Sequence, residues 1–124
     1  MNFIAVGVGA VLGAWLRWGL GIALGAAHPK LAAGTLAANL GGGYLIGIAL
    51  GVFASFPQLA PEWRLLIITG FLGGLTTFSS FSGESMVLLQ RGEYGWALAH
   101  AALHLIGSIV CCIAGYASWR AFSS

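Results

Sequence analysis

Charged residues are scarce in this sequence. Of its 124 residues only 6% are Asp, Glu, Lys or Arg, whereas 59% are hydrophobic. So few ionisable groups cannot cover the surface of a soluble globule of this size, and we therefore expect lipid to surround most of the chain. The basic residues are spread over turns and chain ends and form no patch, which argues against a nucleic-acid partner.

Carboxylates are scarcer still. The chain has no Asp, and its first 61 residues contain no Glu. Because a proton-coupled cation pump uses an acid deep in a membrane span, this shortage disfavours that class of protein. The two cysteines, Cys111 and Cys112, are adjacent. On a helix they point about 100° apart, so we expect no disulfide between them.

Four hydrophobic runs are long enough to cross a bilayer, whose core needs about 20 apolar residues per helix. Short polar turns separate the runs, so we predict a single domain over residues 1–124. We predict that the first run is a span and not a signal peptide, because no basic residue precedes it and Arg17 interrupts it. The predicted spans are 3–27, 31–56, 63–89 and 94–122.

The basic residues are divided almost evenly between the two ends of these spans. Arg64 and Arg120 fall on one side of the membrane, and Lys30 and Arg91 fall on the other, with Arg17 toward the same end. Because the Lys and Arg bias sets orientation, a weak bias leaves two alternatives open: one fixed orientation, or insertion both ways, which permits an antiparallel dimer. Four helices are also few to enclose a polar pathway, so we expect an oligomer.

Glycines recur at four-residue spacing in the first three spans. This spacing lets helix backbones approach closely, either between subunits or, as we favour for any single pair, within one subunit. The glycines are Gly9 and Gly13, Gly21 and Gly25, Gly43 with Gly47 and Gly51, and Gly70 and Gly74.

A polar, glycine-rich run from Gly73 to Phe81 interrupts the third span. We predict a helix break here in preference to a continuous, glycine-softened helix. Backbone groups freed at membrane depth are tolerated only when they are buried in protein or hold an ion. Phe78 and Phe81, three residues apart, share a helix face with hydroxyl groups between them. Glu84, one turn after Ser80, is either a vestibule partner for a hydroxyl or basic group, or a solvated end residue.

Polar residues also lie inside spans two and four. Asn39 can either join helices or present hydrogen-bond donors to an anion. Span four carries a stripe at four-residue spacing, formed by His100, His104, Ser108 and Cys112. Zinc suits such ligands, but Cys112 lies too far along the axis to join the histidines, so we favour histidines that line a water-filled groove. Donors without excess negative charge, and Arg17 near an entrance, favour a small anion.

Several of these segments occur together in one known pattern. They are Gly9 to Gly13 with Arg17-Trp18, Gly34-Thr35, Asn39 with Gly43 and Gly47, and Gly70 to Phe81. On these segments the chain resembles the fluoride channels called Fluc or CrcB, and the resemblance runs through all four spans. The motif of span three is specific, whereas the glycine pattern alone is not.

The resemblance implies an all-α membrane protein in a bacterial inner membrane, a dual-topology antiparallel homodimer with a break in its third helix. Its two pores would pass fluoride passively and lower cytoplasmic fluoride, with no enzymatic activity. A structural sodium ion would lie on the dimer axis, bound by the backbone carbonyls of Gly73 and Thr76 of both subunits. Arg17 would lie in a vestibule. The expected fluoride pathway comprises Asn39, Thr77, Phe78, Ser79, Ser80, Phe81, His100, His104 and Ser108.

Three positions depart from the family's usual residues. His100 and His104 stand where Tyr and Ser are usual, and Ser80 replaces a threonine but keeps the hydroxyl. Protonated histidines on the pathway would make conduction rise as the pH falls. Two other classes stay open: a small multidrug-resistance-type transporter, against which the missing carboxylate in span one argues, and an assembly subunit without transport of its own.

Overall fold

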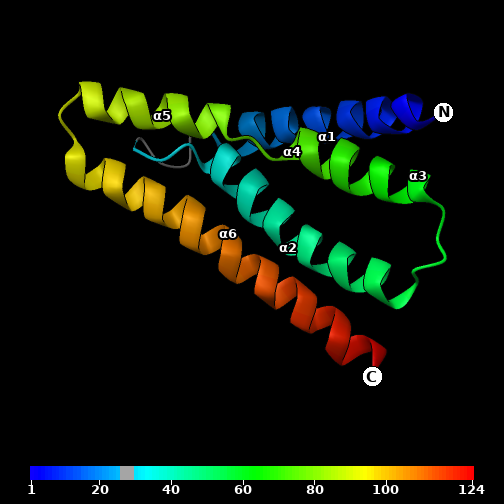
Figure 1. Cartoon of the computed structure of the whole chain (residues 1–124). Coiled ribbons are helices and arrows are strands. Elements are labelled where there is room, and N and C mark those ends of the chain that lie inside the picture. The colour runs from blue at the N-terminus through cyan, green and yellow to red at the C-terminus, as the bar shows by residue number, and fades with distance from the viewer. Residues whose placement is uncertain (26–29) are drawn as a thin grey trace.

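Every regular element that the computed structural model describes is a helix. The structure describes residues 1–25 and 30–124. Three spans are single helices, whereas the third consists of four consecutive helical segments (Figure 1). The elements are α1 (Asn2–Leu24), α2 (Ala33–Ser55), α3 (Pro61–Arg64), the π-helix η1 (Leu65–Leu72), α4 (Gly73–Leu75), α5 (Ser79–Gln90) and α6 (Tyr94–Ser123).

Helices long and apolar enough to cross a membrane occupy all four predicted spans. They are Asn2–Leu24, Ala33–Ser55, Pro61–Gln90 and Tyr94–Ser123. These bounds confirm the prediction of an all-helical, four-span chain. The predicted end of span one and the turn after it fall on residues 26–29, which lie outside the described part of the chain.

α2 is the central helix of the bundle. It makes its most extensive contact with α6 and also touches α1, while α1 packs against η1 and α4 (Figure 1). Both chain ends and the connection between α2 and α3 lie toward one end of the molecule, and the turn between α5 and α6 lies at the other. An even number of spans requires this arrangement, which also brings α5 against α6.

Glycines allow the backbones of α2 and α6 to touch. A Cβ atom at Gly43 would lie 2.8 Å from the carbonyl oxygen of Ser108, and one at Gly47 would lie 2.8 Å from the amide nitrogen of Tyr116. From the other side, a Cβ at Gly115 would collide with the backbone of α2. The four-residue glycine spacing in span two therefore serves packing within one subunit.

The third span breaks between α4 and α5, as predicted, but the glycine pair is not the break. Gly73 and Gly74 are helical, and the non-helical residues are 76–78, in the hydroxyl part of the run. Gly74 has a different role, because a Cβ there would lie 2.5 Å from the carbonyl oxygen of Ala10 in α1. The glycines thus bring α1 against the third span, and the residues after them leave the helix.

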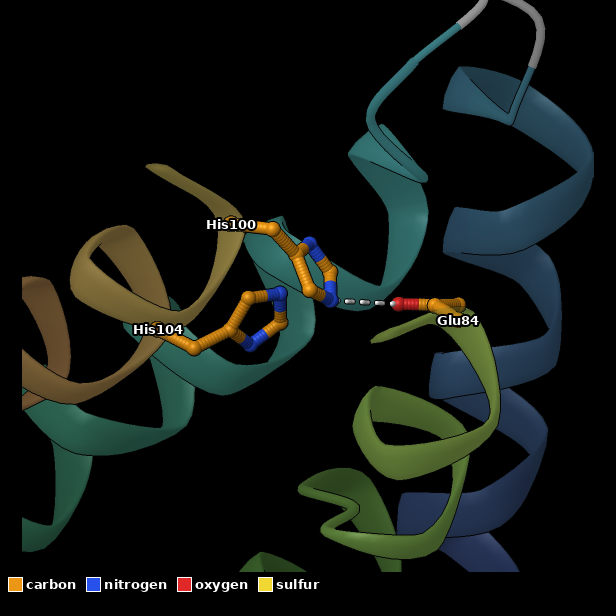
Figure 2. A group of neighbouring side chains, drawn as sticks. All are labelled: Glu84, His100 and His104. Carbon is orange, nitrogen blue, oxygen red and sulfur yellow. Dashed lines mark ion pairs between the residues drawn. The ribbon is translucent and has the colours of Figure 1, made fainter. Parts of the chain in front are cut away.

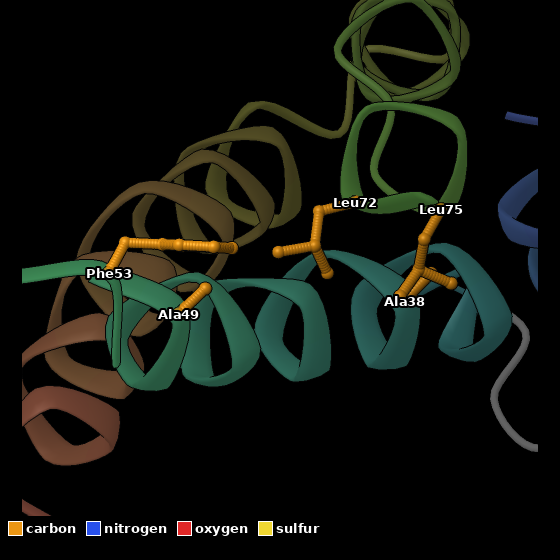
Figure 3. Packing of buried hydrophobic residues seen from close by; sticks show 5 residues of the cluster. All are labelled: Ala38, Ala49, Phe53, Leu72 and Leu75. Carbon is orange, nitrogen blue, oxygen red and sulfur yellow. The ribbon is translucent and has the colours of Figure 1, made fainter. Parts of the chain in front are cut away.

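The buried hydrophobic cluster within one chain is small. Leu72 and Leu75 project from the last turns before the break onto α2, where Leu75 lies beside Ala38 (Figure 3). Ala49 and Phe53 extend the cluster along α2 (Figure 3). This packing fixes the end of α4 against α2, and so fixes where the chain leaves the helix.

Candidate functional site

The break starts at Thr76, whose backbone is extended, with φ −87° and ψ 156°. Its amide nitrogen and its hydroxyl both donate to the carbonyl of Leu72, at 3.0 and 2.8 Å. The hydroxyl thereby strengthens the last helical turn just where the chain turns away. At membrane depth, the peptide groups beyond this point need partners from elsewhere in the protein.

Asn39 of α2 supplies both partners for the peptide groups of Thr77. The Thr77 amide donates to Asn39 Oδ1 at 2.8 Å, and Asn39 Nδ2 donates to the Thr77 carbonyl at 3.0 Å. Because a backbone N–H only donates and a carbonyl only accepts, these two bonds fix which end of the side-chain amide is oxygen. Asn39 therefore joins α2 to the third span at the break itself, and its predicted place in the fluoride pathway stays a prediction.

The fixed amide of Asn39 also sets the protonation of His104. Asn39 Nδ2 lies 2.9 Å from His104 Nδ1. Since that amide nitrogen is a donor, Nδ1 accepts, and the proton of the neutral ring lies on Nε2. His104 is 6% exposed, and its Nε2 has no hydrogen-bond partner among the described residues. The wall of the site therefore holds a buried N–H donor whose hydrogen bond is unused.

The hydroxyl run surrounds the start of α5. Thr77 Oγ1 accepts the amide of Ser80 at 3.1 Å and lies 3.3 Å from the hydroxyl of Ser79. Ser79 and Ser80 thus lie next to Thr77 in the first turn of α5. The Thr77 hydroxyl thereby satisfies one of the amides at the start of α5, which have no helical partner of their own.

The same hydrogen bonds leave two carbonyls of the break without their helical donors. In a continuous helix the amide of Thr77 would bond to Gly73 and the amide of Ser80 would bond to Thr76. Instead these amides donate to the side chains of Asn39 and Thr77. The carbonyls of Gly73 and Thr76, which are predicted to bind sodium, are therefore among those that lose a helical donor at the break.

Arg17 of α1 reaches the break from its other side. Its Nε donates to the carbonyl of Gly74 at 3.1 Å, and its side chain is partly buried. The guanidinium therefore supplies a donor to a third carbonyl of the break, and places a positive charge beside it. Its predicted place in a vestibule stays a prediction.

Aromatic rings form a stack from the break to α6. The ring centroids of Phe78 and Phe81 are 5.4 Å apart, and Phe81 lies 5.0 Å from the ring of His100 and 4.8 Å from that of His104. Phe78 is 79% exposed within one chain, whereas Phe81 is partly buried. The predicted phenylalanine pair and histidine pair are therefore parts of a single cluster.

A groove of about 470 Å³ lies beside the break and is lined by α2, α6 and the third span. The predicted site residues that line it are Asn39, Gly73, Thr76, Thr77, Phe78, Phe81, His104 and Ser108. The rest of the lining is aliphatic or glycine, and none of its residues carries a carboxylate. The break, the aromatic pair and the span-four stripe thus meet at one surface.

Four predicted site residues do not line this groove. Ser79 and Ser80 contact Thr77, His100 stacks on Phe81, and Arg17 contacts the break through Gly74.

Sequence reasoning left the role of Glu84 open, and the structure identifies its partners. Thr35 donates its hydroxyl to Glu84 Oε2 at 2.6 Å, and His100 Nε2 lies 3.5 Å from Oε1 (Figure 2). Glu84 thus has a hydroxyl partner and lies beside a histidine, whereas its predicted place in a vestibule stays a prediction. Thr35 was not predicted as a site residue. Its place in the Gly34-Thr35 motif is the feature of the sequence that could have identified it.

The fold and this site define a small multi-pass membrane protein with a polar groove built at a broken helix. Residues 4–116 match the family described as CrcB-like protein, Camphor Resistance (CrcB), and the chain belongs to this family. The resemblance inferred from the sequence motifs is thereby confirmed.

Relatives of the chain carry the name fluoride-specific ion channel FluC. The protein of Cupriavidus pinatubonensis is 58% identical over 120 residues, which cover 97% of this chain and 95% of the relative. The protein of Cupriavidus metallidurans is 55% identical over 123 residues, which cover 99% of this chain and 98% of the relative. The protein of Pseudomonas putida is 55% identical over 118 residues, which cover 95% of this chain and 93% of the relative. These names describe ion channels, in agreement with the prediction that the chain is not an enzyme.

Proposed function

We propose that this chain forms a fluoride-selective channel that exports fluoride passively across a bacterial inner membrane. Family membership and the names of the relatives support the ion and the mechanism class. The observation that carries the proposal is the groove at the break, where hydrogen-bond donors and aromatic rings meet and no carboxylate contributes to the lining.

The groove chemistry suits a small anion that has to shed water and leave again. The edges of Phe78 and Phe81 are electropositive, and the hydroxyl of Ser108 can donate. Together they replace part of an anion's hydration without a fixed positive charge that would trap it. Arg17 and Lys30 lie outside the groove lining, in keeping with this requirement.

We further propose an antiparallel homodimer with two pores. Three observations support a second subunit: the groove is open along one chain, Phe78 is 79% exposed, and basic residues are nearly balanced between the two ends of the spans. A second chain related by a two-fold axis would close the groove and cover the exposed ring. Each pore would then be lined by both subunits.

A structural sodium ion between the subunits fits the backbone at the break. Sodium prefers oxygen ligands, and the Gly73 and Thr76 carbonyls have lost their amide donors to side chains. Both residues line the open groove. Two carbonyls from each subunit would supply four oxygens, and the ion would join the broken helices of the dimer.

The membrane potential provides enough energy for export without coupling. A potential of 100 mV, negative inside, drives a monovalent anion outward by about 2.3 kcal/mol. At about 1.4 kcal/mol per factor of ten, this corresponds to a gradient of roughly 50-fold. A passive pore of this kind needs neither a nucleotide nor a proton-relay acid.

Efflux from liposomes that contain only this protein tests the proposal against its two alternatives. A channel releases fluoride down its gradient with no proton gradient imposed. A small multidrug-resistance-type transporter would instead accumulate cationic compounds only when a proton gradient is present, and an assembly subunit would move neither. Absence of fluoride release from well-folded, reconstituted protein would count against the channel.

A further inference from the structure

A second group of polar side chains lies next to the groove, between α5 and α6. Glu84 projects from α5 toward His100 and His104, which lie one turn apart on α6 (Figure 2). One ligand atom from each of the three residues lies within 4.8 Å of the other two. We propose that this triad binds a zinc-class divalent metal ion, and that the bound ion inhibits the channel.

Three buried atoms of this triad have no hydrogen-bond partner among the described residues. They are His100 Nε2, His104 Nε2 and Glu84 Oε1. His100 is 1% exposed and His104 is 6% exposed, so water cannot readily serve either ring. A buried polar atom without a partner costs free energy, and a single ligand that contacts all three atoms would remove that cost.

The donor set is one that zinc accepts. Two imidazole nitrogens and one carboxylate oxygen form a three-ligand site with a fourth position open. Bonds of about 2.0 to 2.1 Å in tetrahedral geometry separate ligand atoms by about 3.4 Å. His100 Nε2 and Glu84 Oε1 are already 3.5 Å apart, so the main adjustment falls on His104. Sodium and magnesium prefer oxygen ligands alone, so this site is chemically distinct from the carbonyls of the break.

The hydrogen bonds of Asn39 couple this metal site to the groove. A metal on His104 Nε2 takes the lone pair of that nitrogen, so the ring proton moves to Nδ1. Nδ1 then faces Asn39 Nδ2, which is also a donor and is held in place by Thr77. Metal binding therefore opposes the Asn39 contact that holds the break and adds a positive charge beside Phe81, where an anion would be held.

Calorimetric titration of zinc into the purified, EDTA-treated protein tests the site. We expect one zinc ion per chain, no comparable binding of Mg²⁺, and an affinity lowered at least about tenfold in Glu84→Gln and in His100→Gln. The matched controls are Glu62→Gln, a carboxylate at the other end of the third span, and Cys112→Ser, the other soft ligand on α6. Both should keep the affinity of the original chain. Absence of saturable zinc binding, or equal affinity in Glu84→Gln and His100→Gln, would overturn the site.

The inhibitory role rests on the proposed channel function and needs a second readout. Zinc should slow fluoride efflux from liposomes, EDTA should restore it, and Glu84→Gln should be insensitive when compared with its own zinc-free rate. Unchanged efflux at saturating zinc would refute the inhibition. If the protein conducts no fluoride at all, calorimetry still decides whether the metal site exists, so the two failures are distinguishable.

Discussion

Asn39→Leu removes the side chain that joins α2 to the broken helix while keeping its approximate size. Three groups lose their partner: the amide of Thr77, the carbonyl of Thr77 and Nδ1 of His104. The substitution leaves the hydrophobic contacts of Leu72 and Leu75 with α2 in place. It therefore isolates the polar contribution of Asn39 to the geometry of the break.

The loss can be bounded from the three hydrogen bonds. A buried group left without a partner costs about 1 to 3 kcal/mol, while side-chain hydrogen bonds in membranes average nearer to about 0.6 kcal/mol. About 0.7 to 1 kcal/mol for each group gives a total of about 2 to 3 kcal/mol. At about 1.4 kcal/mol per factor of ten, the ratio of intact to disrupted break falls about 30- to 150-fold. We expect the protein to lose about 2 to 3 kcal/mol of stability and the rate of fluoride efflux to fall by up to this factor.

The assay is fluoride efflux from liposomes, with thermal unfolding of the purified protein measured alongside. Asn2→Leu is the matched control, because Asn2 is the same residue type at the exposed start of α1. This control should change stability by no more than about 0.5 kcal/mol and leave efflux unchanged. An Asn39→Leu protein whose stability lies within about 0.5 kcal/mol of the original, with unchanged efflux, would refute the reasoning from these hydrogen bonds.

Three other perturbations have defined outcomes. Phe81→Ile removes the ring between Phe78 and the two histidines and should lower the rate of fluoride efflux at least about tenfold. The control Phe3→Ile changes an exposed ring and should leave the rate unchanged. Equal efflux rates for Phe81→Ile and the original chain would contradict a pathway role for the ring. Gly47→Val places a Cβ against the backbone of α6 and should destabilise the protein by at least about 1 to 3 kcal/mol, measured by thermal unfolding. The control Gly19→Val, where a Cβ meets nothing within 4 Å, should keep the melting temperature of the original chain. Contrary to the expectation from the histidine stripe, efflux should stay unchanged as the pH falls from about 8 to about 5.5, because a proton on His104 Nδ1 would face the Asn39 donor; a rise that the double substitution His100→Gln with His104→Gln abolishes would contradict this reasoning.

The spans and the break were predictable because they depend on local composition. Long apolar runs separated by short polar turns set the four helices, and the described helix bounds agree with the predicted spans to within a few residues. The position of the break within the run was not predictable locally. The Thr77 amide leaves the helix for Asn39, a residue 38 positions earlier in the chain.

The roles of the glycines in the third span also depended on tertiary structure. Gly73 and Gly74 are flexible residues in a polar run, yet both are helical. Gly74 is needed because α1 approaches to within contact of its backbone, and composition alone does not reveal that neighbour. The π-helix Leu65–Leu72 before the break has no signal in its apolar sequence, since its wide turns arise where it packs on α1.

The residues around Glu84 show the same limit. The four-residue spacing of His100 and His104 correctly predicts that the two rings share a face of α6. Their contact with Glu84 depends on how α5 is rotated after the break, which the spacing within α6 does not determine. The metal alternative considered from the sequence used Cys112 as the third ligand, whereas the structure brings Glu84 to the histidines instead.

Ion selectivity in a purified system tests the central claim most directly. The liposomes contain only this protein and are loaded with both fluoride and chloride. They are then made permeable to potassium, and ion-selective electrodes measure each anion in the outside solution. We predict rapid fluoride efflux and chloride efflux no faster than from protein-free liposomes. No fluoride efflux, or chloride efflux at an equal rate, would contradict a fluoride-selective pathway at the broken third span.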